Sequence, residues 1–163
     1  MGDTLGKKAE KKIWKWLDRP EDGYSFTRLY DQLSGYYLTS RNICDFICYK
    51  YPYIYYIESK ATEADRFPFS YIQPHQHDGL LAKSKIPGCY GLVIVLFATY
   101  KRAFVIDIRT IDMLSQAGTS SINIKKISKW NFPYKELRTI DSRKMLLDYS
   151  GEIEEFVSEL GEV

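Results

Sequence analysis

The chain has 163 residues, the size of a single domain, with 45% hydrophobic and 27% charged residues and a formal net charge of +2. No stretch approaches the roughly 18 apolar residues of a membrane helix, and no apolar signal segment follows the lysine-rich N-terminus. We therefore expect a protein of the cytoplasm with no membrane partner. The three cysteines fit neither a disulfide framework nor a zinc site, so reduced thiols are expected.

Hydrophobic spacing predicts the elements in chain order. They are a helix at 4–17, a loop at 20–23, a strand at 24–30, a connection at 32–41, strands at 42–49 and 53–60, a loop at 61–72, a helix at 74–85, strands at 90–98 and 102–108, and helices at 109–117 and 150–160. The apolar run at 90–98 is typical of a central strand buried on both faces. This order predicts an α/β fold in which helices flank a central mixed β-sheet.

Two carboxylates and a lysine fall on one face of the predicted hairpin. Glu58 and Lys60 are two residues apart in a strand and so share a face. A turn centred between Tyr51 and Pro52 places Asp45 directly opposite Glu58, where Cβ atoms are about 4.5–5.5 Å apart. The hairpin therefore predicts a compact Asp45, Glu58 and Lys60 cluster.

Carboxylates this close repel each other unless positive charge lies between them, and their oxygens suit Mg²⁺ or Mn²⁺. The backbone carbonyl of Ser59 would be a further ligand. Such an ion polarises a phosphoryl oxygen and activates water, while Lys60 orients that water or neutralises charge on the phosphate. The alternative is an exposed hairpin face with a cross-strand ion pair. Against that alternative, these charges interrupt strands that are otherwise apolar and aromatic, where they cost stability.

Longer segments carry a family resemblance. The string CDFICYKYPYIYYIESKAT, followed by FPFSYIQPHQ, resembles phage-type RecU-like Holliday junction resolvases of the PD-(D/E)XK nuclease superfamily. The segments GKKAEKKIWKWL and RLYD are similar to parts of the same group, and all four occur in the family's order between about residues 6 and 110. Cys44 stands where the superfamily has proline, and the connection at 32–41 is shorter than the stalk of cellular RecU proteins.

The resemblance implies a restriction-endonuclease-like core and a single nuclease domain over residues 1–163. The core would span about 4–127, and a C-terminal extension with a helix would span about 128–163. The implied activity is a Mg²⁺-dependent endodeoxyribonuclease, with Mn²⁺ as a substitute, that resolves four-way DNA junctions in recombination and repair. Two symmetric cuts imply a homodimer. If the gene is phage-encoded, the enzyme acts in the host cytoplasm.

The resemblance also assigns roles by position. Asp45 and Glu58 become direct metal ligands, Glu10 an outer carboxylate of the metal site, Lys60 the residue that positions water, and Gln76 an assistant at the scissile phosphate. The expected DNA contacts are Arg28, Lys7, Lys8, Lys11 and His75. As alternatives, Glu10 is a helix-surface residue, His75 and Gln76 are capping groups, and Arg28 pairs with Asp31. His77 is expected to face solvent.

Other functions fit part of this pattern. A restriction-type or nicking repair nuclease shares the same fold, because substrate choice depends on loops and dimer geometry. A catalytically idle DNA-binding module would not need all the acidic and lysine positions that are present. The 14 tyrosines would suit a protein-interaction domain, but that class does not explain the register of Asp45, Glu58 and Lys60.

Overall fold

The computed structural model describes residues 4–30, 32–34, 37–141, 146–147 and 152–161. The helices are α1 (Leu5–Leu17), α2 (Pro74–Ser84), α3 (Ile108–Gln116) and α4 (Glu152–Gly161), with 3₁₀ segments η1 (Pro20–Asp22), η2 (Phe69–Tyr71), η3 (Ala98–Tyr100) and η4 (Ile124–Lys129). The strands are β1 (Tyr24–Arg28), β2 (Gln32–Ser34), β3 (Tyr37–Ser40), β4 (Phe46–Lys50), β5 (Tyr53–Thr62), β6 (Arg66–Pro68), β7 (Cys89–Phe97), β8 (Arg102–Asp107), β9 (Ser121–Asn123), β10 (Lys135–Leu137), β11 (Thr139–Asp141) and β12 (Leu146–Leu147). None of the described helices is long and apolar enough to cross a bilayer.

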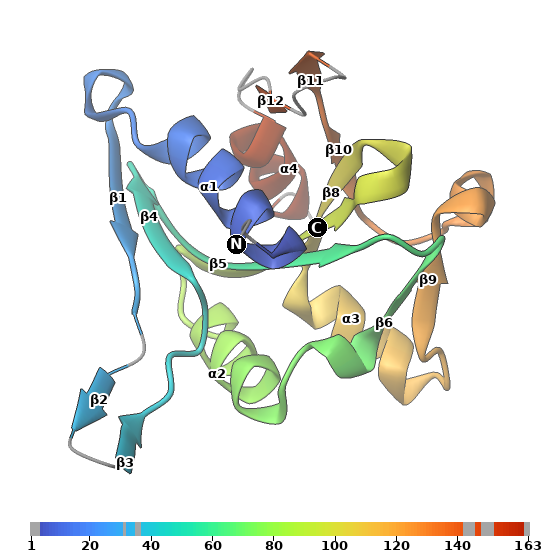
Figure 1. The fold of residues 1–163 in the computed structure, drawn as a ribbon, viewed down its shortest axis with the longest axis horizontal. Coiled ribbons are helices and arrows are strands. Elements are labelled where there is room, and N and C mark those ends of the chain that lie inside the picture. Colours follow the sequence, from blue (N-terminus) through green and yellow to red (C-terminus); the bar gives the residue numbers. More distant parts are fainter. Residues whose placement is uncertain (1–3, 31, 35–36, 142–145, 148–151, 162–163) are drawn as a thin grey trace.

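One six-stranded mixed sheet organises these elements. Its order is β1-β4-β5-β7-β8-β10, and every neighbouring pair is antiparallel except β5 and β7, which are parallel. The connection between the parallel strands carries α2, as a parallel pair requires a crossover. In Figure 1, α1 and α4 cover one face of the sheet, and α2 and α3 cover the other. The predicted mixed sheet flanked by helices is confirmed.

Two apolar layers hold the helices to the sheet. Ile13 and Leu17 of α1 and Phe156 of α4 are buried with one face of the strands, and Leu80 of α2 and Ile111 of α3 with the other. Strand β7 contributes alternate residues to both layers, so its near-continuous apolar run is explained by burial on both sides. The predicted N-terminal helix is confirmed, and the Thr4 side chain caps it by accepting from the Lys7 amide.

Several short strands differ from the sequence predictions. The connection at 32–41 contains the hairpin β2–β3, the predicted strand at 42–49 begins only at Phe46, and the loop at 61–72 contains β6, which pairs with β9. Strand β10 forms the sixth strand of the sheet by pairing with β8. Each of these strands is three to five residues long. Such segments carry too little periodicity to be recognised without their partners.

Close packing at Gly91 supports a stability prediction. A Cβ at this position would lie 2.7 Å from the carbonyl oxygen of Leu80 in α2 and 2.9 Å from the Ser84 hydroxyl. We expect Gly91→Ala to lower the free energy of unfolding by roughly 1–3 kcal/mol, since β7 and α2 must separate. Gly6→Ala is the matched control, because a Cβ there meets nothing within 4 Å and should stabilise α1 slightly. Urea unfolding of both variants measures these free energies. Equal changes in the free energy of unfolding for Gly91→Ala and Gly6→Ala would contradict the prediction.

Candidate functional site

The predicted hairpin register is confirmed, and it brings Asp45 beside β5. Phe46 pairs with Ile57 and Lys50 with Tyr53 across the β4–β5 hairpin. One residue before β4, the Asp45 amide donates to the Ile57 carbonyl at 3.0 Å. The Ser59 amide in turn donates to Asp45 Oδ2 at 2.8 Å. This last bond anchors the Asp45 carboxylate against the segment that carries Glu58 and Lys60.

Glu58 is a buried carboxylate with one oxygen satisfied and one without a partner. Glu58 belongs to β5, and the residue is only 2% exposed. Oε1 accepts from Lys60 Nζ at 2.9 Å and from Gln76 Nε2 at 2.8 Å. Oε2 is buried and accepts no hydrogen bond from any residue that the structure describes. A buried carboxylate oxygen without a partner is costly, which indicates a role beyond packing.

The proximity of the two carboxylates changes their acidity. Burial, followed by the negative charge of Asp45, raises the pKa of the Glu58 carboxyl to about 7 against the opposing effect of Lys60. Burial also raises the pKa of Asp45, although the hydrogen bond from the Ser59 amide counteracts this. Both groups therefore favour a positive partner at neutral pH. The Lys60 ammonium supplies only part of that compensation.

Gln76 connects the carboxylate site to the beginning of α2. Its Nε2 donates to Glu58, and its Oε1 accepts from Lys60 Nζ at 3.1 Å and from the Gln73 amide at 3.0 Å. The last bond is half of a capping box in which the Gln73 side chain also accepts from the helix backbone. Pro74 at the first helical position fixes the helix start. The glutamine is thus both a capping group and a member of the site.

Glu10 of α1 forms an ion pair with Arg28 at the end of β1. The charge of Glu10 raises the pKa of both Asp45 and Glu58, so it lies near the pair. The Arg28 guanidinium also lies over the Tyr30 ring, 5.0 Å from the ring centroid. The alternative partner for Arg28, Asp31, lies outside the described residues.

A cleft of about 460 Å³ opens over this site. It is lined by Glu10, Arg28, Leu29, Tyr30, Arg41, Asn42, Cys44, Asp45, Gln73, His75 and Gln76. Five of the predicted site residues therefore line one cleft. The predicted phosphate contacts Lys7, Lys8 and Lys11 are exposed on α1 and do not line it. Arg41 and Tyr30 were missed, although each borders the short hairpin that precedes Asp45 in sequence.

The donor set suits a hard divalent cation. Asp45 and Glu58 offer carboxylate oxygens, one of them without a partner. The N–H and C=O of a strand residue point toward the same neighbouring strand. Because the Ser59 N–H donates to Asp45, the Ser59 carbonyl also points toward Asp45. Within the described ranges, no three His, Cys, Asp or Glu side chains form a group that could hold an ion. The oxygen donors gathered here are the carboxylates of Asp45 and Glu58 and the Ser59 carbonyl, while Glu10 forms an ion pair with Arg28.

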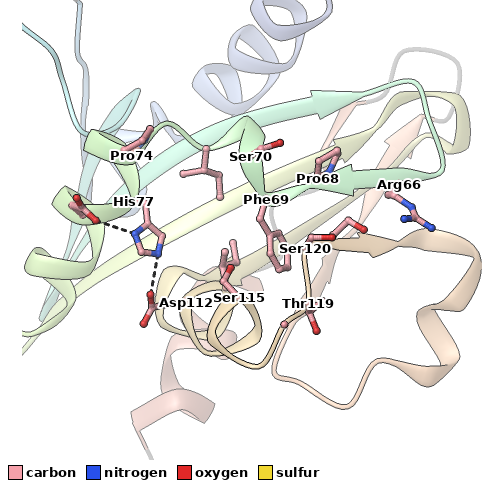
Figure 2. Close-up of a pocket in the computed structure, with 15 residues that line it drawn as sticks. Arg66, Pro68, Phe69, Ser70, Pro74, His77, Asp112, Ser115, Thr119 and Ser120 are labelled. Atoms are coloured by element: carbon pink, nitrogen blue, oxygen red, sulfur yellow. Dashed lines mark hydrogen bonds and ion pairs between the residues drawn. The ribbon is translucent and has the colours of Figure 1, made fainter.

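His77 differs from its expected solvent-facing position. Its side chain is 26% exposed, and its Nδ1 and Nε2 lie 3.1 Å from oxygens of Asp78 and Asp112. Figure 2 shows the His77 ring held between these two carboxylates. Asp112 belongs to α3, a contact that sequence spacing could not reveal.

Comparison with known proteins identifies the family and the fold of this chain. The family model described as Recombination protein U, RecU, matches residues 27–154, more than half of the chain. No curated protein sequence matches this chain. Among solved structures, the chain is similar to Hjc, a Holliday junction resolvase from the archaeon Archaeoglobus fulgidus, at 13% identity and a TM-score of 0.51, covering 74% of this chain and 89% of that chain. That likeness confirms the predicted restriction-endonuclease-like fold. The chain therefore belongs to the RecU family of Holliday junction resolvases.

Proposed function

We propose that this chain resolves four-way DNA junctions as a Mg²⁺-dependent endodeoxyribonuclease whose cutting site is Asp45, Glu58 and Lys60. The observation that carries this assignment is the unpartnered, buried Oε2 of Glu58 beside Asp45. A structural ion pair between Glu58 and Lys60 would leave no such oxygen without a partner. Membership of the RecU family supplies the junction as substrate.

Asp45, Glu58 and the Ser59 carbonyl would hold the ion. When bound, Mg²⁺ supplies Lewis-acid polarisation of a phosphoryl oxygen and lowers the pKa of water, and Mn²⁺ would substitute. The protein fixes this donor set before substrate arrives, because the Ser59 amide restrains Asp45. Glu10 would act as an outer carboxylate, and Arg28 fixes its position.

Lys60 and Gln76 provide the neighbouring polar groups. The Lys60 ammonium lies between Glu58 and Gln76, where it can hold a proton beside an attacking water or offset charge on the phosphate. Gln76 presents an amide at the cleft and would orient the scissile phosphate. Arg28 and His75 line the same cleft and would contact the DNA backbone. Lys7, Lys8 and Lys11 would contact phosphates farther away along α1.

Paired cutting follows from the symmetry of the substrate. A four-way junction with two-fold character needs two symmetric incisions, so we propose a homodimer with one site per protomer. We propose that residues 1–163 form one nuclease domain, which acts in the cytoplasm, with the C-terminal α4 packed on the same sheet layer as α1.

A gel assay with matched substrates tests this function. Purified protein with Mg²⁺ should cut a four-way junction at paired positions and much faster than a fork or a linear duplex of the same sequence. Equal cutting of all three would reject junction specificity and favour a restriction-type or repair nuclease. No cutting in Mg²⁺ or Mn²⁺ would reject the enzyme.

A further inference from the structure

A second hollow begins beside the catalytic cleft and leads away from it. It has a volume of about 820 Å³, and Pro74 and His77 at one end flank the cleft residues His75 and Gln76 in sequence. Figure 2 shows His77 at this end and Arg66 of β6 at the other. The hydroxyl side chains along its walls are Ser70, Ser115, Thr119, Ser120 and Ser121. The wall near α2 and α3 also carries Asp78 and Asp112, both in contact with His77.

Beyond Arg66 the hollow continues into a smaller one of about 270 Å³. The two share Arg66, Thr119 and Ser121, so they form one groove. Lys126 and Lys129 of η4 line the far part together with aromatic residues, and none of the described Asp or Glu residues lines it. We call this far part the basic end of the groove; its residues are Arg66, Leu114, Thr119, Ser121, Ile122, Asn123, Lys126, Lys129, Trp130, Asn131 and Phe132.

The cations of the basic end have no acidic partner in the part of the chain that the structure describes. Among the described residues, Arg66, Lys126 and Lys129 form no ion pair within 4.0 Å. By contrast, the neighbouring Lys125 lies 3.1 Å from the Asp65 carboxylate and does not line the groove. Three uncompensated cations around one hollow favour an anionic ligand. The hydroxyl groups that lead to them can donate hydrogen bonds to phosphate oxygens.

The aromatic wall of the basic end is held rigidly. Trp130 and Phe132 stack with ring centroids 5.2 Å apart and planes 27° apart, and both remain partly exposed. The Trp130 Nε1 donates to the Asn123 carbonyl at 3.2 Å, while the rings of Phe104 and Tyr134 meet the indole edge-on. A fixed, partly exposed aromatic pair beside cations is the combination that binds unstacked bases.

We propose that the basic end binds an unpaired stretch of DNA, with its phosphates on Arg66, Lys126 and Lys129 and a base against the stacked pair of Trp130 and Phe132. A duplex would offer phosphates to the lysines but would hide its base faces from the rings. This inference rests on the proposed function, since the groove begins beside the catalytic cleft and would receive a strand opened at a junction. It adds a single-strand site that the cutting chemistry does not require.

Oligonucleotide binding in EDTA separates this site from cutting. The probe is a fluorescein-labelled oligodeoxythymidine about 12 nucleotides long, compared by anisotropy with an abasic strand of equal length. Lys126→Gln/Lys129→Gln should weaken binding of the oligodeoxythymidine by about tenfold at 0.1 M salt and reduce the salt slope by roughly 1.4, about 0.7 for each lost phosphate contact. The control Lys15→Gln/Lys85→Gln removes two exposed lysines that do not line the groove and should change neither value. An equal loss in both double variants would overturn the proposal.

The aromatic contribution needs a separate variant. Phe132→Leu keeps an apolar side chain but removes the ring, and it should reduce binding of oligodeoxythymidine about tenfold while leaving the abasic strand unchanged. Unchanged oligodeoxythymidine binding in this variant, with a native circular dichroism spectrum, would overturn base stacking. Equal binding of oligodeoxythymidine and the abasic strand by the wild-type protein would do the same. The binding assay contains no metal, so a negative result in it does not affect the cutting assay. A protein that binds single strands but cuts no substrate would reject the proposed function and leave this inference standing.

Discussion

Asp45→Asn is expected to abolish junction cleavage while leaving DNA binding close to that of the wild-type protein. The amide keeps the shape of the side chain and an oxygen that can still accept from the Ser59 amide, so the hairpin remains in place. It removes one of the two negative charges that would hold Mg²⁺. Metal ions contribute several kcal/mol of transition-state stabilisation, so the single-turnover rate should fall by about a thousandfold or more.

The matched control is Asp18→Asn. This aspartate is exposed at the end of α1, where it accepts from the Trp14 indole, and it does not line the catalytic cleft. Its variant should cut at the wild-type rate. Cleavage by Asp45→Asn within tenfold of the wild-type rate, in saturating Mg²⁺ with native folding, would remove Asp45 from the site.

The metal-free protein is expected to become less stable as the pH rises from about 4.5 to about 7. Glu58 has a pKa of about 7 in the folded protein, against its ordinary value of 4.5. Between these values the folded protein holds a proton that the unfolded chain has lost. The contribution of Glu58 to the free energy of unfolding is therefore fully present below about pH 4.5. It is lost as the pH rises through 7, which lowers the free energy of unfolding by roughly 3 kcal/mol. The pKa of Asp45 is also raised, which adds to this loss of stability.

Chemical unfolding in EDTA at several pH values measures this, with Glu58→Gln as the comparison. The neutral glutamine cannot titrate, so the stability difference between variant and wild-type protein should grow across the same pH window and favour the variant at pH 8. Adding Mg²⁺ at pH 8 should stabilise the wild-type protein and leave Glu58→Gln nearly unchanged. A constant difference between the two proteins from pH 4.5 to pH 8 would show that Glu58 has an ordinary pKa.

The sequence was most informative where contacts are local. The β4–β5 hairpin has a short turn and alternating faces, so its register and the approach of Asp45 to Glu58 followed from spacing alone. The unbroken apolar run of β7 likewise predicted a central strand. The resemblance added Glu10 and Gln76, which spacing alone could not relate to the hairpin.

Contacts between distant segments were not predictable in the same way. Nothing in the sequence indicates that the Gln76 amide would lie between Glu58 and Lys60, or that Arg28 would pair with Glu10. These contacts depend on how α2 and α1 pack on opposite faces of the sheet. The three-residue strands β6 and β9 also form only because they meet each other, and they shape the groove that leads away from the cleft.

The single parallel pair in the sheet implies an order of events during folding. The hairpin joins residues close in sequence, Lys50 with Tyr53, whereas the β5–β7 pair begins with Ile54 and Cys89 and must close a far longer loop. Longer loops cost more entropy to close and form later. Asp45 and Glu58 should therefore meet early, while still hydrated and readily ionised. Only when the crossover docks β7 and α2 against β5 does Glu58 lose its water, so the chain delays the most unfavourable electrostatic step until most of the apolar core can offset it.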